Sequence, residues 1–130
     1  MKLSEYFEQV KGTGVLATAS GEGEVDVAIY ARPHFVDEQT VAFIMADRLS
    51  HRNLQSNPHA AYLFVERSEG YKGKRLHLTK VGEETDPEKI QALRRRPLPA
   101  ECLVEGESRY LVHFRIDRVR PLVGDDPEVA

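Results

Sequence analysis

What this sequence lacks excludes several classes of protein. Its 130 residues contain one cysteine, Cys102, and no tryptophan. A single cysteine cannot form an internal disulfide, which is typical of a reducing compartment. The N-terminal stretch MKLSEYFEQV has no apolar core of a signal peptide, and no run of about 18 apolar residues follows it. We therefore expect a cytoplasmic protein that does not enter a membrane.

An excess of positive charge is also missing. The formal net charge is -3 and the isoelectric point is near 6.0. A nucleic-acid-binding protein needs a surplus of lysine and arginine to contact phosphates, so we do not expect a nucleic-acid partner. The length suits one domain with one core. We assign residues 1–122 to this domain and residues 123–130 to a flexible C-terminal tail.

The familiar catalytic and cofactor motifs are absent. There is no HExxH or CxxC, and the five histidines have no partner at a spacing typical of zinc, so no metal site is expected. There is no G-x-S-x-G elbow, and Cys102 lies in a proline-rich loop without a base near it in sequence. Glycine loops of the G-x-G-x-x-G and GxxxxGK[ST] types are missing too. No catalytic residue can be assigned, and a cofactor must be held in some other way.

The apolar residues that are present predict a mainly β protein. Compact apolar or alternating segments separated by turn residues indicate six strands, at residues 14–20, 25–36, 40–46, 59–66, 74–84 and 108–122. Pro33 suggests an edge or a bend in the second strand. The third, TVAFIMA, is too apolar for an edge, and the alternation of the sixth slips by one residue. The short connections favour an antiparallel sheet that curls into a small barrel.

Three short helices are expected around this sheet. The first is capped by Ser4 and carries the apolar stripe of Leu3, Phe7 and Val10. The second spans residues 51–57, with Ser50 or Asp47 as its cap. The third opens at Asp86 and Pro87 and turns Ile90 and Leu93 inward, with Arg94–Arg96 at its negative end.

The segment RLSHR, Arg48–Arg52, is the strongest candidate for a ligand site. Two guanidinium groups and the Ser50 hydroxyl meet the start of a short helix, where backbone amides point outward, and this combination suits a phosphate. A solvated loop whose arginines pair with nearby acids explains the same residues equally well. For KGKR, Lys72–Arg75, a charged turn is the alternative to a ligand role.

The run from GVLATAS through VDVAIYARPHFV, TVAFIMA and RLSHR to NLQSNP resembles the pyridoxamine 5'-phosphate oxidase-like, FMN-binding split-barrel family. The order and spacing of these segments carry the likeness. It implies a six-stranded antiparallel split β-barrel of Greek-key type with peripheral helices, which forms a homodimer with one FMN at each end of the interface.

The resemblance also implies which residues hold FMN. Arg48, Leu49, Ser50, His51 and Arg52 form the loop for its phosphate. Val27, Ala28, Ile29 and Tyr30 match the stretch that runs along the ribityl chain and the isoalloxazine, with Ala28 and Ile29 acting through their backbone. Lys72, Lys74 and Arg75 match a region that approaches the flavin from the partner subunit.

This sequence departs from the family at two places. Ser50 stands where many members carry a lysine, so Arg48 or Arg52 must supply the charge. The chain is also much shorter than the vitamin B6 oxidases, so oxidation of pyridoxamine phosphate is not implied.

The resemblance therefore favours an FMN-binding redox protein, either a small bacterial flavin oxidoreductase or an electron carrier with a small-molecule substrate. Two alternatives stay open. One is a non-catalytic protein of the same fold for a deazaflavin or for haem, which would need His51, His59 or His77. The other is a regulatory dimer with an empty site.

Overall fold

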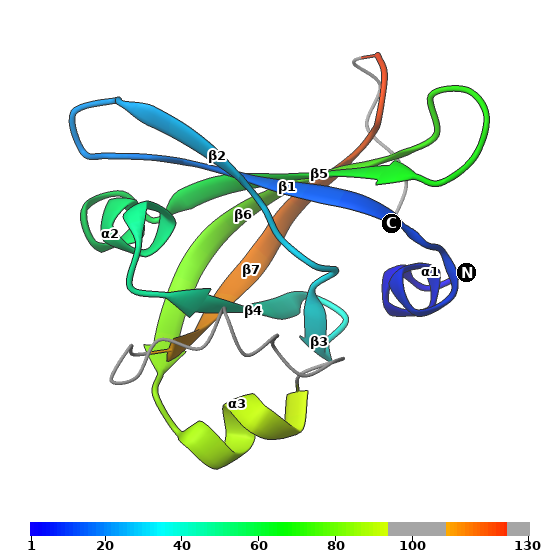
Figure 1. The fold of residues 1–130 in the computed structure, drawn as a ribbon. Coiled ribbons are helices and arrows are strands. Elements are labelled where there is room, and N and C mark those ends of the chain that lie inside the picture. The colour runs from blue at the N-terminus through cyan, green and yellow to red at the C-terminus, as the bar shows by residue number, and fades with distance from the viewer. Residues whose placement is uncertain (94–108, 125–130) are drawn as a thin grey trace, which may run out of the picture.

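The computed structural model describes residues 1–93 and 109–124, which form three helices and seven strands (Figure 1). The elements are α1 (Leu3–Gln9), β1 (Gly12–Ala19), β2 (Val25–Ile29), β3 (His34–Asp37), β4 (Thr40–Ala46), α2 (Leu49–Ser56), β5 (His59–Glu66), β6 (Gly73–Glu84), α3 (Pro87–Leu93) and β7 (Arg109–Pro121). None of the described helices is long and apolar enough to cross a membrane. The predictions for Cys102, Arg94–Arg96 and residues 125–130 lie outside the described residues.

The strands form one antiparallel sheet in the order β2-β1-β5-β6-β7-β4-β3. Within the described residues β2 and β3 are its two edges, and no ladder of hydrogen bonds joins them. They are nevertheless consecutive in the chain, because the segment after Ile29 crosses from one edge to the other (Figure 1). The sheet is thus curled but not closed, which confirms the predicted mainly β split barrel.

The predicted number of six strands is wrong, because the second predicted strand is two strands. The chain leaves β2 after Ile29 and re-enters the sheet at His34. Pro33, which has no N–H to donate, lies buried within this crossing. The hydroxyl of Tyr62 in β5 donates to the carbonyl oxygens of Tyr30 and Ala31, at 3.2 and 3.1 Å, and fixes the crossing.

Gly14 of β1 makes room for that hydroxyl. A Cβ atom at this position would overlap the Tyr62 Oη atom and the carbonyl oxygen of Tyr30. Glycine is therefore required by close approach and not by an unusual φ angle.

The core fills the inside of the curled sheet, and its aromatic rings come from both halves of the chain. Phe7 of α1 is buried against Phe64 of β5, with ring centroids 5.0 Å apart in an edge-to-face arrangement. The helix α1 therefore plugs one end of the barrel. On the outer side, Ile90 of α3 packs with Ala42 of β4 and Leu111 of β7. This covers the second face of β4 and explains its apolar sequence.

The slip predicted in the last strand is confirmed. His77 pairs with Arg118 and Leu78 pairs with Ile116, so Asp117 is an extra residue in β7. The cap predicted for the third helix is also confirmed, since Asp86 Oδ1 accepts a hydrogen bond from the Glu88 amide at 3.0 Å. The cap predicted for the first is wrong. Lys2 holds the N-cap position of α1, and the amide and hydroxyl of Ser4 bind Glu38 instead.

We predict that Gly14→Ala destabilises the protein by about 2 kcal/mol, because the methyl group forces the Tyr62 hydroxyl away from the crossing. Gly82→Ala is the matched control, since a Cβ atom there meets nothing within 4 Å. Urea unfolding of both variants measures the difference. Equal stability of the two variants would contradict the role assigned to Gly14.

Candidate functional site

The N-terminus of α2 has no side-chain cap. Arg48 holds the N-cap position in an extended conformation, and its side chain makes no capping hydrogen bond. The predicted cap by Ser50 or Asp47 is therefore wrong. The Arg52 amide, 3.0 Å from the Arg48 carbonyl oxygen, makes the first hydrogen bond of the helix. The amides of the three preceding residues, Leu49–His51, are thus oriented as donors for an anion.

Ser50 does not cap α2 because its side chain is used elsewhere. It is buried, with 4% of its surface exposed, and its hydroxyl is hydrogen-bonded to that of Tyr30. Burial raises the pKa of Tyr30, and the charge of Asp26 adds to the rise, while the Ser50 bond and the charge of Arg48 oppose it. The Tyr30–Ser50 bond ties the start of α2 to the end of β2.

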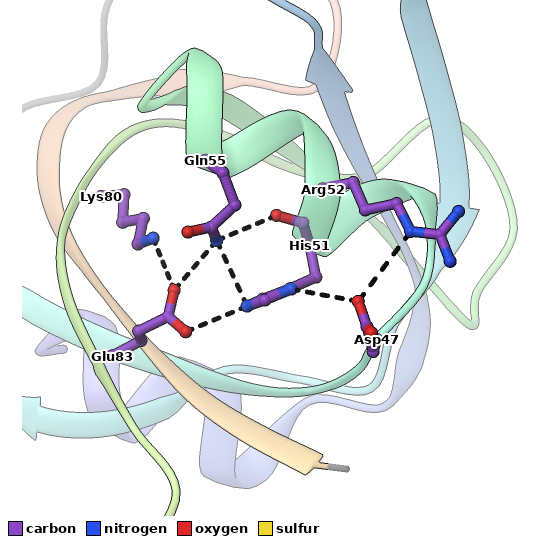
Figure 2. Close-up of polar contacts among 6 residues, drawn as sticks. All are labelled: Asp47, His51, Arg52, Gln55, Lys80 and Glu83. Atoms are coloured by element: carbon purple, nitrogen blue, oxygen red, sulfur yellow. Dashed lines mark hydrogen bonds and ion pairs between the residues drawn. The ribbon is translucent and has the colours of Figure 1, made fainter. Parts of the chain in front are cut away.

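His51 is the most enclosed basic side chain of the RLSHR segment. Only 8% of its side chain is exposed, and its ring stacks on Tyr110 of β7 with centroids 3.8 Å apart. Its Nε2 atom lies 3.0 Å from Glu83 Oε2 on β6 (Figure 2). This contact joins α2 to the far end of β6.

The ionisation of Glu83 determines which atoms donate and which accept in these hydrogen bonds. Burial alone would raise the pKa of Glu83, but hydrogen bonds from Lys80, Gln55 and His51 lower it to about 2. An ionised carboxylate only accepts, so His51 Nε2 carries the proton and donates it to Glu83. The Gln55 amide group then donates to Glu83 Oε1 at 3.0 Å and to the His51 carbonyl oxygen at 3.1 Å.

The other ring nitrogen of His51 faces the N-terminus of α2. Its Nδ1 atom is buried and makes no hydrogen bond within the described residues. It lies 3.7 Å from Asp47 Oδ1, which is also 3.9 Å from the Nε atom of Arg52 (Figure 2). Asp47 therefore forms an ion pair with Arg52, which agrees with the alternative in which the arginines of this segment pair with nearby acids.

The structure brings the two main groups of predicted site residues together. The helix α2 packs against β1 and β2, and the Tyr30–Ser50 bond joins Val27–Tyr30 to Arg48–Arg52. On β2, Val27 and Ile29 point outward, with 66% and 78% of their surfaces exposed. As β2 is an edge strand, half of its backbone groups are also directed away from the sheet.

The third group of predicted site residues, Lys72, Lys74 and Arg75, does not join the other two groups within one chain. Lys72 and Lys74 flank the start of β6, whereas Glu83 lies near its other end. The Nζ atom of Lys74 is 4.6 Å above the Tyr6 ring of α1, and Arg75 donates to the carbonyl oxygens of Pro121, at 2.8 Å, and Gly124. Contact of Lys72, Lys74 and Arg75 with a flavin near α2 would need a second subunit and stays a prediction.

The sequence analysis did not predict the residues outside Arg48–Arg52 that keep His51 in place. These are Gln55, Lys80, Glu83 and Tyr110. Gln55 could have been found, since it follows His51 by four residues on the same face of a helix. Glu83 could not, because its contact depends on the bulged register between β6 and β7. In residues 1–93 and 109–124, no three His, Cys, Asp or Glu side chains are arranged to hold a metal.

Solved structures with a similar fold include proteins from several sources. An FMN-binding protein from Syntrophomonas wolfei subsp. wolfei is 13% identical, with a TM-score of 0.73 over 96% of this chain and 86% of that chain. A Clostridium acetobutylicum protein related to general stress protein 26, of the pyridoxinephosphate oxidase family, is 12% identical, with a TM-score of 0.63 over 91% of this chain and 84% of that one. The fold is that of the pyridoxamine 5'-phosphate oxidase-like split barrels.

A further split barrel of this kind is an F420 reductase, 18% identical, with a TM-score of 0.68 over 92% of this chain and 98% of that chain. No family model matches the sequence, and no curated protein matches it. The family resemblance seen in the sequence is therefore confirmed at the level of the split-barrel fold.

We predict that Glu83→Gln lowers the free energy of unfolding at neutral pH by about 2 kcal/mol, since the pKa of Glu83 is lowered from 4.5 to about 2. A carboxylate with a lowered pKa stabilises the fold above its ordinary pKa, and this contribution is lost as the pH falls towards 2. The difference between wild type and variant should therefore shrink from about pH 5 to about pH 2.

Urea unfolding across this pH range tests the prediction. Glu69→Gln is the control, because Glu69 is exposed in the loop between β5 and β6. A difference between wild type and Glu83→Gln that does not change with pH would contradict the assigned role of the carboxylate.

Proposed function

We propose that this split barrel binds FMN, with the phosphate at the N-terminus of α2, and works as a flavin-dependent redox protein. The observation that carries the proposal is the uncapped start of α2, where a buried serine and an arginine adjoin oriented amides. The FMN-binding protein of the same fold supports this choice of ligand.

The donors present fit a phosphate group. Three backbone amides, the positive end of the helix dipole and the Arg48 guanidinium would meet its oxygens. The Nδ1 atom of His51 is not one of these donors, because the ring donates to Glu83 through Nε2.

The rest of the ligand would lie along β2. The exposed side chains of Val27 and Ile29 offer apolar surface, and the outward backbone groups of the edge strand suit the hydroxyls of a ribityl chain. Bound FMN would supply one- or two-electron transfer, and the protein would hold and shield it. No catalytic side chain is assigned.

The outer face of the sheet supports a homodimer. The register places Ile29 opposite Val15 and Val15 opposite Leu63, so three apolar side chains lie side by side across β2, β1 and β5. Ile29 and Leu63 are exposed in a single chain. We propose that a second copy covers this face and that the flavin lies at its margin.

A deazaflavin is the second candidate ligand, favoured by the F420 reductase of the same fold. Haem bound through His51 is less well supported, because the ring of His51 is buried against Tyr110 and its Nε2 proton is donated to Glu83. A single cysteine is typical of proteins in a reducing compartment, so we propose the cytoplasm as the location.

We predict that the purified protein takes up FMN and that Arg48→Ala weakens FMN binding by about tenfold or more, because a charge-assisted contact to the phosphate is lost. Riboflavin, which lacks the phosphate, should bind wild type and variant equally. Flavin fluorescence titration measures both affinities. Arg67→Ala, which removes an exposed cation beyond β5, is the control.

Each outcome of this experiment is decisive. No uptake of FMN at micromolar concentration would reject the proposal, and uptake of a deazaflavin in its place would favour the second candidate. An equal loss of riboflavin and FMN affinity in Arg48→Ala would show that Arg48 does not act through the phosphate. It would contradict the placement of the phosphate at α2.

We also predict that Ile29→Asp converts a dimer into a monomer, since a charge on the apolar face would be buried without a partner. Sedimentation velocity measures the change. Val36→Asp is the control, because Val36 is 59% exposed on β3, the opposite edge of the sheet. A wild-type monomer, or loss of the dimer in the control alone, would contradict the assigned interface.

A further inference from the structure

Charge is unevenly distributed over the outer face of the sheet, the face proposed above for the dimer. Residues paired across neighbouring strands lie side by side on one face, so the register gives the rows that cross it. From β2 to β7, one row is Val27, Ala17, Ala61, His77 and Arg118. The next row is Ile29, Val15, Leu63, Arg75 and Arg120. Both rows are apolar over β2, β1 and β5 and basic over β6 and β7.

Two arginines at the basic end have no acidic partner among the described residues. Arg75 donates to two backbone carbonyl oxygens near the end of β7, which are neutral groups. Arg118 is exposed and makes no hydrogen bond or ion pair with the described part of the chain. The acid next to it in sequence, Asp117, is paired with Arg115 at 2.7 Å. The charges of Arg75 and Arg118 are therefore not balanced by ion pairs of their own.

His77 lies among these arginines, and its ionisation depends on them. Burial lowers the pKa of His77, and the charges of the three neighbouring arginines lower it further, while Asp117 acts in the opposite direction. At neutral pH His77 therefore adds no charge of its own. A positive potential remains at this end of the face, and an anionic group would balance it.

Two carboxylates without partners lie at the opposite edge of the sheet. Glu22 and Glu24 are exposed in the turn that joins β1 to β2, and neither carboxylate is hydrogen-bonded or ion-paired to any described residue. The turn is held in shape, because Ser20 Oγ accepts from the amides of Glu22 and Glu24, at 3.2 Å each. The amide of Gly21 also donates to Ser56 Oγ of α2 at 3.0 Å. An ordered turn therefore presents the two negative charges.

The acidic turn and the basic end are too far apart to meet within one chain. The strands β2 and β7 are separated by four strand spacings, or about 19 Å along the sheet. Figure 1 shows the turn between β1 and β2 and the end of β7 on opposite sides of the barrel. A second copy related by a twofold axis through this face would bring each acidic turn to the basic end of the other copy, so the contact would form twice. Near the middle of the face, Ala17 lies beside Ala61, and these small side chains let two sheets approach closely.

We propose that the carboxylates of Glu22 and Glu24 in one copy pair with the guanidinium groups of Arg75 and Arg118 in the other. The proposal rests on the homodimer proposed above and adds what orients its two copies. An apolar face alone permits several alignments, whereas charge pairs at its margins favour one of them. The pairing needs no bound FMN.

Reversal of the charges tests this pairing. We expect that Glu22→Lys combined with Glu24→Lys, the turn variant, weakens the homodimer by about tenfold or more, and that Arg118→Glu, the strand variant, does the same. Each of these homodimers contains two repulsive contacts. An equimolar mixture of the turn and strand variants should form a heterodimer, because both of its contacts join opposite charges. One chain with all three substitutions should form a homodimer again for the same reason. Sedimentation velocity over a range of concentrations measures each association.

Lys2→Glu and Glu5→Lys are the matched controls, since both side chains are exposed on α1, away from the outer face of the sheet. They should leave the dimer unchanged. A wild-type dimer that survives both reversals, a mixture of variants that stays monomeric, or equal weakening in the controls would overturn this proposal and leave the homodimer standing. A wild-type monomer would overturn the homodimer as well. Flavin binding is measured separately by fluorescence titration, so a failure of the FMN proposal is distinguishable from both.

Discussion

The hydroxyl of Tyr62 is the contact on which the rest of the structure depends. It reaches from the middle of the sheet, past Gly14, to the carbonyl oxygens of Tyr30 and Ala31. There the chain crosses from one edge of the sheet to the other. These two hydrogen bonds come from one side chain in the core, and they stabilise the crossing that curls seven strands into a split barrel.

The crossing also positions the candidate site. Tyr30 packs edge-to-face on Phe43, with centroids 6.0 Å apart, and its hydroxyl holds Ser50 at the start of α2. Two further contacts keep the helix in place, from Asn53 to Thr18 at 3.1 Å and from His51 to Glu83 at 3.0 Å. The amides at the start of α2 are therefore oriented before any ligand binds, which lowers the entropic cost of binding.

The features that could be predicted from the sequence are those that depend on a local pattern of residues. The β7 slip followed from the alternation of its apolar residues, and the Asp86 cap followed from its position before Pro87. The caps assigned to Ser4 and Ser50 failed because each hydroxyl has a partner distant in the chain, Glu38 and Tyr30. The His51–Glu83 pair was not foreseen for the same reason. The segment that the candidate site occupies was predicted, but the network that supports it depends on tertiary register.

The edge strand β2 has a consequence for handling the protein. Val25, Val27 and Ile29 are 82%, 66% and 78% exposed, and the strand pairs only with β1 among the described strands. An unprotected edge with β-branched side chains and no lysine or proline is a template for adding further strands. A partner that covered β2 would also guard the chain against aggregation. Substitutions that uncover this strand should therefore be judged by the loss of protein on storage as well as by the loss of function.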